Sequence, residues 1–563
     1  MRCVVLLMIF ICMLCDCDKH EARFLYFAYG SNLLKSRLLI NCPSAVFITA
    51  AKVPGYRLDF DKYSDNWCGA VATIVADADG EAWGAIWAIK DSELAALDRQ
   101  EGVNSKKYCA KNVKAITPLG HDITARVYHI NSEPPKMQPE IIPLQRRPGN
   151  TYLQVIALGA YECGIPSHYI EYVQRFPVNG RRAKEKIISQ LDIYEYLNYL
   201  PSQYKTKNSK FLSIQKKLIN SFNSTRNANP ATIWVEAENW ISNTSLYPQE
   251  NGMGGKILHA LQASQIALVD NAPKGTQLKL LLLMEGNQKV YFKPRRYNLD
   301  HVINGNIYAG FDRHNSEVFA YYLAMVLNFK WIPPSVIRRV HLHKDIIPVA
   351  TSGLRKTMVK NDKGSTCIYG KCFYCKVNDT VCPNDRGEVE GAAILYLDKQ
   401  LKVFKSPWRR SYNAKRMEWE TDNDYCMKIK GTLSLRRLLN LIDVAIFDFL
   451  IQNGDRHRYE VYKESIILLD NGKGLGNPHI DELDILAPLY QCCMLAISTW
   501  QHLEIISGGN LSETIKLLSA FQGNKLATEE HFRAIERRLL KIYATVQYCI
   551  GRHGSSKVFR SGF

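Results

Sequence analysis

The stretch from Asn453 to Gly476 constrains this chain more than any other. It reads NGDRHRYEVYKESIILLDNGKGLG. Asp455 is followed five residues later by Glu460, and an apolar run, 466–469, ends on Asp470 and a glycine-rich turn. A proton-accepting carboxylate, a second side chain five positions on, and an aspartate at a strand end are the layout of a phosphoryl-transfer site. The same residues also fit a plain surface turn, so the interpretation depends on the rest of the chain.

Length and charge set the broad class. The chain has 563 residues and a formal net charge of +18, which indicates a globular protein of more than one domain with acidic partners. No basic run carries interleaved aromatic residues, so nucleic acid is not favoured as a partner.

Residues 1–23 form a predicted leader. Arg2 precedes an apolar run that reads VVLLMIFICMLC, which is shorter than the roughly 20 residues of a membrane span. A signal peptide or short signal anchor is therefore expected, and membrane contact is expected only through it. The competing interpretation is a buried first strand, because strand-forming residues begin at Phe24.

Cysteine placement divides the chain. Four of the 16 cysteines lie in the leader, and four are scattered singly at Cys42, Cys68, Cys109 and Cys163. The last eight form a tightly spaced even set, which predicts disulfides in an oxidising compartment. Zinc is the alternative for Cys372 and Cys375, although no second such pair accompanies them.

Glycosylation sequons follow the same division. They begin at Asn223, Asn243, Asn378 and Asn510, and none occurs earlier. The C-terminal part is therefore lumenal in style, and the N-terminal part is cytosolic in style.

The first half alternates strands and helices. Strands are expected at 25–28, near Thr73, at 82–89, near Val113 and at 123–130, and helices from Leu33, from Ser92 and over 152–164. Three of its segments read YFAYGSNLL, LDRQEGV and YLQVIALGAYECGIP, with a tyrosine seven residues past Glu101. In this combination the chain from about residue 24 to 177 resembles the γ-glutamylcyclotransferase family.

That resemblance implies a mixed α/β barrel that converts γ-glutamyl amino acids to 5-oxoproline and a free amino acid. Ring closure needs a neutral α-amine, whose pKa is about 8, so a base must remove a proton at neutral pH. By resemblance Glu101 is that base and Tyr152 contacts the substrate. Backbone donors would hold the γ-glutamyl group at Tyr26, Phe27, Ala28, Tyr29, Gly30 and Ser31.

The second half supplies partners for Asp455. Residues 274–297 predict a hairpin that turns at Gly286-Asn287 and whose second strand carries Lys293, and a helix follows with Asp312 at its mouth and Glu317 in its first turns. A strand lysine paired with a helix glutamate is the arrangement that positions ATP phosphates in kinases. In the usual protein-kinase catalytic loop an asparagine stands where this chain has Glu460.

Residues 232–553 resemble the secretory-pathway kinases of the family sequence similarity 20 and four-jointed group, and within it the glycosaminoglycan xylosylkinases. The matching segments are KGTQLK, FKPRRY, DRHNSE, CIYGKCFYC, GDRHRYE, LLDNGKGLGNP and ILAPLYQCC. The resemblance implies ATP and Mn²⁺ (or Mg²⁺), with Asp455 as base, Asp312 and Asp470 on metal, and Glu317 paired with Lys293. It also implies a nucleotide site of Gln277, Lys293, Glu317, Ile394, Leu395, Tyr396, Leu397, Glu460 and Asp470.

The same resemblance implies four disulfides, which spacing alone does not select. They are Cys367–Cys382, Cys372–Cys375, Cys426–Cys492 and Cys493–Cys549.

The sequence therefore predicts a multidomain chain. The predicted parts are the leader, a cyclotransferase-like α/β barrel at 24–178, a linker at 179–231 and an α+β atypical kinase fold with disulfides at 232–563. The expected reaction is phosphorylation of xylose in the proteoglycan linkage glycan, in the Golgi lumen or after secretion.

Three alternatives stay open. The C-terminal half is also consistent with a Golgi Ser kinase of secreted proteins or with a non-catalytic binding scaffold. The two halves also fit two adjacent genes joined in one chain, which transcripts read continuously across residues 180–230 would exclude.

Overall fold

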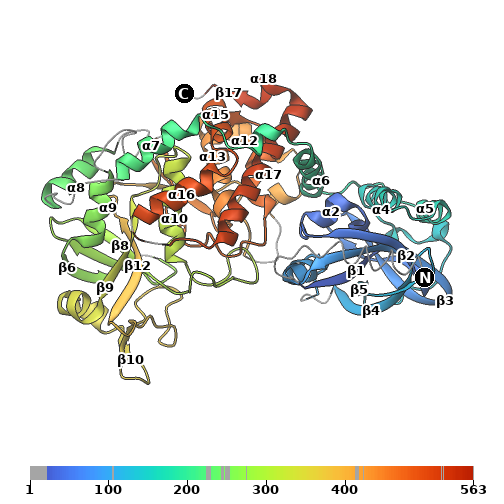
Figure 1. The fold of residues 1–563 in the computed structure, drawn as a ribbon, viewed down its shortest axis with the longest axis horizontal. Helices are drawn as coiled ribbons and strands as arrows, with labels where there is room; N and C mark the ends of the chain where they lie inside the picture. Colours follow the sequence, from blue (N-terminus) through green and yellow to red (C-terminus); the bar gives the residue numbers. More distant parts are fainter. Residues whose placement is uncertain are drawn as a thin grey trace, which may run out of the picture. The chain divides into compact units, whose positions relative to one another are not determined.

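The computed structural model describes residues 22–103, 107–222, 230–241, 246, 254–273, 275–412, 417–422, 424–463, 465–521, 523 and 525–561. Residues 1–21 of the predicted leader and the sequons at Asn223 and Asn243 lie outside the described residues. The chain separates into two compact units, 1–191 and 192–563 (Figure 1). Within the described part of the chain, no helix combines the length and apolar character needed to cross a bilayer.

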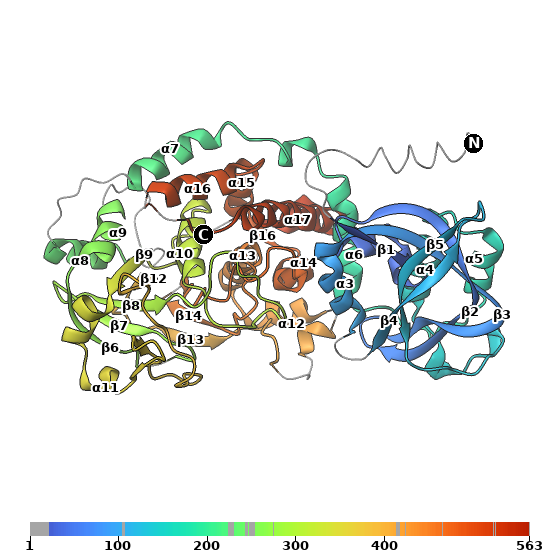
Figure 2. The same cartoon turned by 60° about the horizontal axis from the view of Figure 1, so that its bottom comes forward.

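The N-terminal unit is a closed barrel of five strands (Figure 2). Their order around the barrel is β1 (Arg23–Ala28), β3 (Gly69–Lys90), β2 (Val46–Ser64), β4 (Tyr108–Ile116) and β5 (Asp122–Ile130). The two strands expected near Thr73 and at 82–89 are one strand, because β3 pairs with β2 across its polar middle through a register shift between Pro54 and Tyr56. The predicted α/β barrel is confirmed.

Short helices bring the polar residues of this unit together. They are α2 (Lys35–Leu39), α3 (Leu94–Glu101), α4 (Asn150–Glu162) and α5 (Ser167–Gln174). Helix α3 ends at Glu101 because Gly102 takes a left-handed conformation (φ 69°) and donates back to Arg99. Helix α4 approaches the turn after β1 closely, since a Cβ at Gly159 would lie 2.2 Å from the Leu34 nitrogen.

The larger sheet of the C-terminal unit is antiparallel and has five strands (Figure 1). Its order is β6 (Ile266–Asn271), β7 (Leu280–Met284), β8 (Lys289–Pro294), β12 (Glu388–Leu395) and β9 (Ser335–His341). The expected hairpin is β7–β8, and Gly286 and Asn287 at its turn both have positive φ. Helices α9 (Gly254–Ala263) and α10 (His314–Val326) contact this sheet.

Helices make up most of the remaining C-terminal unit. They are α12 (Tyr425–Thr432), α13 (Leu435–Ile451), α14 (Ala487–Cys492), α15 (Ile497–Ile505), α16 (Asn510–Phe521) and α17 (Glu529–His553). A small sheet of β13 (Lys402–Lys405), β14 (Arg458–Tyr462) and β15 (Ser465–Ile467) lies on both sides of Asp455 in the sequence. Minor elements are α8 (Pro230–Asn239), α11 (Ser352–Arg355), α18 (Ser555–Val558), β10 (Met358–Lys360), β11 (Thr366–Ile368), β16 (Leu495–Ala496) and β17 (Phe559–Arg560).

Much of the segment expected to be a linker is folded. Helix α6 (Glu185–Asn198) spans the boundary between the units, and α7 (Phe211–Phe222) packs against α16. Phe211 and Phe222 are buried in the core of the C-terminal unit, and Gln215 donates to the Thr514 hydroxyl at 2.9 Å. The polar composition of this segment concealed these few buried residues, whose partners lie about 100 to 300 residues further along the chain.

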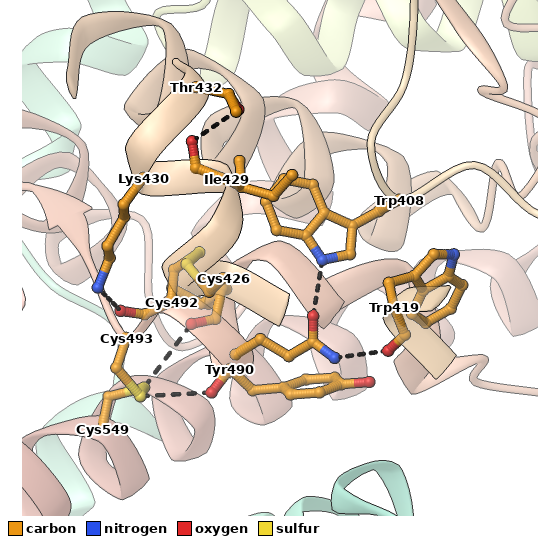
Figure 3. Close-up of a disulfide and its surroundings, with 12 residues drawn as sticks. Trp408, Trp419, Cys426, Ile429, Lys430, Thr432, Tyr490, Cys492, Cys493 and Cys549 are labelled. Atoms are coloured by element: carbon orange, nitrogen blue, oxygen red, sulfur yellow. Dashed lines mark hydrogen bonds between the residues drawn. A yellow bond between two sulfur atoms is a disulfide. The ribbon is translucent and has the colours of Figure 1, made fainter. Parts of the chain in front are cut away.

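All four implied disulfides are present. Cys426–Cys492 and Cys493–Cys549 join α12, α14 and α17 through two adjacent cysteines (Figure 3). Because Cys372 is bonded to Cys375, the zinc alternative is wrong. Asn378 is exposed, whereas Asn510 is fully buried with its amide donating to the Asn208 carbonyl, so its sequon is closed in the folded protein.

A buried ion cluster fixes α17 to the segment after the glycine-rich turn. Asp481 accepts hydrogen bonds from Arg537 at 2.7 Å and Arg538 at 2.8 Å, and it lies 3.0 Å from Lys541. Burial raises the pKa of Asp481, but the three cations outweigh it and hold that pKa well below its usual range.

We expect Asp481→Asn to destabilise the C-terminal unit by about 3 kcal/mol or more, because it leaves Arg538 buried without a countercharge. Urea denaturation at pH 7 measures this. The unfolded carboxyl has a pKa of about 3.9, so the stabilisation is present above about pH 4 and is lost as pH falls toward the folded pKa. The difference in the free energy of unfolding between the wild type and Asp481→Asn should therefore decrease as the pH is lowered.

The matched control is Asp398→Asn. Asp398 is 77% exposed and lies 3.7 Å from Lys289, so its loss should cost less than about 1 kcal/mol. Equal effects of the two substitutions would contradict the role given to Asp481.

Two candidate active sites

A buried lysine surrounded by carboxylates forms the centre of the C-terminal site. Lys293 Nζ lies 2.6 Å from Glu317 and 2.9 Å from Asp312, and it also donates to Asp470. Burial lowers the pKa of Lys293, but these carboxylates raise it well above its ordinary value. Lys293 in turn holds the pKa of Asp470 below its usual range. The pairing expected between Lys293 and Glu317 is therefore present.

The carboxylates outnumber the lysine. Asp312, Glu317 and Asp470 each offer an oxygen within 4.8 Å of the others, the one such group found among the described residues. Hard divalent cations such as Mn²⁺ and Mg²⁺ prefer oxygen ligands, and these three carboxylates supply them, although a second ammonium, Lys473 Nζ, also lies 3.9 Å from Asp312. The residues fit a divalent cation, and they add Glu317 to the two ligands expected from the sequence.

A cavity of about 300 Å³ adjoins this cluster. Its lining includes most of the predicted nucleotide site: Lys293, Glu317, Ile394, Leu395, Tyr396, Leu397, Glu460 and Asp470. Lys279 and Tyr291 also line it, and no sequence signal pointed to them. Gln277 lies instead in a smaller neighbouring hollow with Arg296 and Asp312.

Asp455 lies in the loop that follows α13, the apolar helix that was expected to lead into it. Its carboxylate accepts a hydrogen bond from the Tyr412 hydroxyl, which is also 2.8 Å from His457 Nδ1. The hydrogen bond to Asp455 raises the pKa of His457. The Asp455 side chain is 24% exposed, and the Tyr412 hydroxyl occupies one of its oxygens.

Arg456 connects the loop that carries Asp455 to the loop that carries Asp470. Its guanidinium makes two 2.8 Å hydrogen bonds to Asp448 on α13, one of 2.7 Å to Asn471, and one to the Leu469 carbonyl. The positions of Asp455 and Asp470 are therefore tied through one buried side chain. The sequence argument overlooked Arg456 because a charged residue in such a loop usually faces solvent.

The N-terminal site forms around Glu101. Asn32 Nδ2 donates to Glu101 Oε1 at 2.8 Å and lies 3.1 Å from the Tyr26 hydroxyl, and Gln100 donates to the Asn32 oxygen at 2.7 Å. Burial raises the pKa of Glu101 to about 7, although Arg37 opposes the rise. A carboxyl with this pKa is suited to take and return a proton near neutral pH.

Tyr152 lies next to the turn after β1. Its hydroxyl accepts from the Ala72 backbone N–H at 3.1 Å and from the Ser31 N–H. A Cβ at Gly30 would lie 3.3 Å from that hydroxyl, so the turn and Tyr152 are in direct proximity. Phe27 and Ala28 are fully buried and paired with β3, which leaves their side chains no route to a substrate.

Comparison with known families and proteins agrees with both halves. The family described as Golgi casein kinase, C-terminal, Fam20 matches residues 232–558, and the AIG2-like family matches residues 81–173. With its closed barrel, the N-terminal unit is γ-glutamylcyclotransferase-like, as the sequence indicated.

A Drosophila melanogaster protein named glycosaminoglycan xylosylkinase homolog is 42% identical over 371 residues, covering 65% of this chain and 88% of that protein. A solved structure of hydra Fam20 with sugar is 37% identical with a TM-score of 0.56, covering 60% of this chain and 99% of the other. The Golgi casein kinase with Mn/ADP bound is 27% identical with a TM-score of 0.56, covering 68% and 95%. The family match over more than half of the chain and this shared kinase fold show that the chain belongs to the Fam20 family.

Proposed function

We propose that the C-terminal unit is an ATP- and Mn²⁺-dependent kinase that phosphorylates the 2-hydroxyl of xylose in the proteoglycan linkage glycan. The observation that carries the proposal is the Lys293 cluster, which lies beside a nucleotide-sized cavity. The 42% identity to a xylosylkinase homolog favours a sugar acceptor. The proposed location is the Golgi lumen or the secreted space, where the four disulfides would be stable.

Each residue has a defined task in this proposal. Lys293, held by Glu317, binds ATP phosphates, and Ile394 to Leu397 face the adenine. Asp312 and Asp470 would hold Mn²⁺, which neutralises charge on the phosphates when bound. Asp455 accepts the proton of the attacking hydroxyl, which would take the place of the Tyr412 hydroxyl that donates to it in this structure.

Replacing the proposed base should abolish transfer without abolishing nucleotide binding. We expect Asp455→Asn to lower kcat by about 10²- to 10⁴-fold, because the amide accepts no proton. Transfer from ATP with Mn²⁺ to a xylose-linked acceptor measures kcat, and calorimetry measures Mn²⁺-ATP binding. Exposed Asp362 on the β10–β11 turn provides the control, Asp362→Asn. Undiminished transfer by Asp455→Asn would refute the assignment.

The acceptor can be tested separately. A Ser kinase is the second candidate, since the matched family and one solved neighbour are named as Golgi casein kinases. We expect kcat/KM for a xylose-linked glycan to exceed that for a casein-type Ser peptide by at least about tenfold, a difference of about 1.4 kcal/mol in transition-state binding. The reverse order would favour the Ser kinase, and failure to bind ATP with Mn²⁺ would favour a scaffold.

We propose further that the N-terminal unit is a γ-glutamylcyclotransferase. In this reaction the substrate α-amine attacks the γ-carbonyl carbon, a new C–N bond closes the ring, and the original amide bond breaks. Glu101 takes the proton from the amine and delivers it to the leaving amine. The support is the gathering of Glu101, Asn32 and Tyr152 beside the turn at Ser31.

This assignment predicts a pH profile. Glu101 has a pKa of about 7 and accepts a proton only when ionised, so kcat/KM should rise as pH increases from about 6, reach half its limit near pH 7 and level off near pH 8. Glu101→Gln should lower turnover of a γ-glutamyl amino acid by about 10²-fold or more, while exposed Glu140→Gln should not. Release of 5-oxoproline is the readout, and an unchanged acid limb in the wild type would contradict the role.

A further inference from the structure

Arg37 is buried in the N-terminal unit, and one of its N–H donors makes no hydrogen bond. It lies on the short helix α2, directly after the turn that carries Ser31, and is 9% exposed. Its Nε is buried without a hydrogen-bond partner. Buried side-chain donors are nearly always paired, so an orphaned guanidinium nitrogen requires an explanation.

The surroundings of Arg37 are the proposed active site. Its guanidinium carbon lies 5.9 Å from the Trp67 ring centroid, and Trp67 contacts Tyr152 at 4.8 Å between centroids. The charges of Arg37 and Glu101 act on each other. Arg37 is therefore linked to Tyr152 through the Trp67 ring and is near enough to Glu101 for their charges to interact.

A buried guanidinium with a free donor is suited to a planar carboxylate, which it binds through two parallel hydrogen bonds. A γ-glutamyl group carries a carboxylate on the carbon that bears its reacting amine. Whatever holds that carboxylate must lie beside the base that deprotonates the amine. The charge of Arg37 acts on Glu101, and binding a carboxylate would satisfy its unpaired Nε.

We propose that Arg37 binds the α-carboxylate of the γ-glutamyl substrate and thereby selects it. The proposal rests on the cyclotransferase function. It adds that the site requires the carboxylate as well as the amine, and that 5-oxoproline, which keeps the carboxylate, binds through the same side chain.

A substrate without the carboxylate isolates this contact. A 4-aminobutanoyl amide has the same chain and amine, and it closes to 2-pyrrolidinone by the same bond changes. The full-length wild type should prefer the γ-glutamyl substrate by about 100-fold in kcat/KM, as expected for a buried charge-assisted contact. Arg37→Met should remove most of this preference by slowing the γ-glutamyl substrate alone, and Arg37→Lys should keep part of it.

A second arginine of the N-terminal unit provides the control. Arg175→Met alters a half-exposed arginine paired with Glu140 and should leave the preference intact. If Arg37→Met slows both substrates equally, Arg37 acts through Glu101 or through folding, and the carboxylate proposal is overturned. Circular dichroism and thermal melting identify a folding defect, and Arg37→Lys, which keeps the charge, then serves for the comparison.

Calorimetry with 5-oxoproline and 2-pyrrolidinone separates this inference from the proposed function. Tighter binding of 5-oxoproline that Arg37→Met abolishes upholds the role of Arg37 even when no turnover is seen, in which case the cyclotransferase function fails. Turnover with no dependence on Arg37 overturns the inference alone. Absence of both turnover and 5-oxoproline binding overturns both.

Discussion

The C-terminal unit is organised around the burial of one ammonium among three carboxylates. Lys293 is 6% exposed and is held on β8 by pairing with β12, while Glu317 and Asp312 come from the start of α10 and its preceding loop. Charges at such distances interact strongly where they are buried, as Asp312 and Glu317 are, so loss of the lysine would set these two carboxylates against each other and against the more exposed Asp470. Lys293 is therefore the nearest countercharge of all three carboxylates.

Holding this cluster next to Asp455 demands very close backbone approach. A Cβ at Gly472 would lie 2.7 Å from the Asp312 Cβ, and one at Gly454 would lie 2.3 Å from Ile307. These two glycines explain why the stretch from Asn453 to Gly476 needs glycine on each side of its carboxylates. Arg456 then joins the two loops, so that Asp455 and Asp470 are positioned by packing rather than by their own short loops.

The sequence predicts those features of the site whose residues lie close together along the chain or follow a strand or helix pattern. Asp455, Glu460 and Asp470 fall within sixteen consecutive residues, and strand and helix patterns place Lys293 and Glu317 on the right elements. Gln277 was expected on the nucleotide site, but its place in a separate hollow depends on how the Cys372–Cys375 loop packs beside it. Tyr412 and Asp455 are 43 residues apart, and no periodic pattern records their contact. Arg37 was missed for a similar reason, because its burial arises only when the barrel closes.

The two sites use carboxylates in opposite ways. Burial raises the pKa of Glu101 to about 7, which suits proton transfer near neutral pH, whereas Lys293 lowers the pKa of Asp470, which keeps that carboxylate ionised. The sequence contrasts a unit with single cysteines and a unit with disulfides, but the structure makes this contrast less important for stability in an oxidising compartment. Cys42 and Cys163 are buried, and burial raises the pKa of each thiol, so neither forms the reactive thiolate readily. In an oxidising lumen only Cys68 and Cys109, of the four cysteines that lie outside disulfides in the described residues, would be partly open to oxidation. An N-terminal barrel of cytosolic style is therefore chemically compatible with a disulfide-bonded kinase unit in one chain.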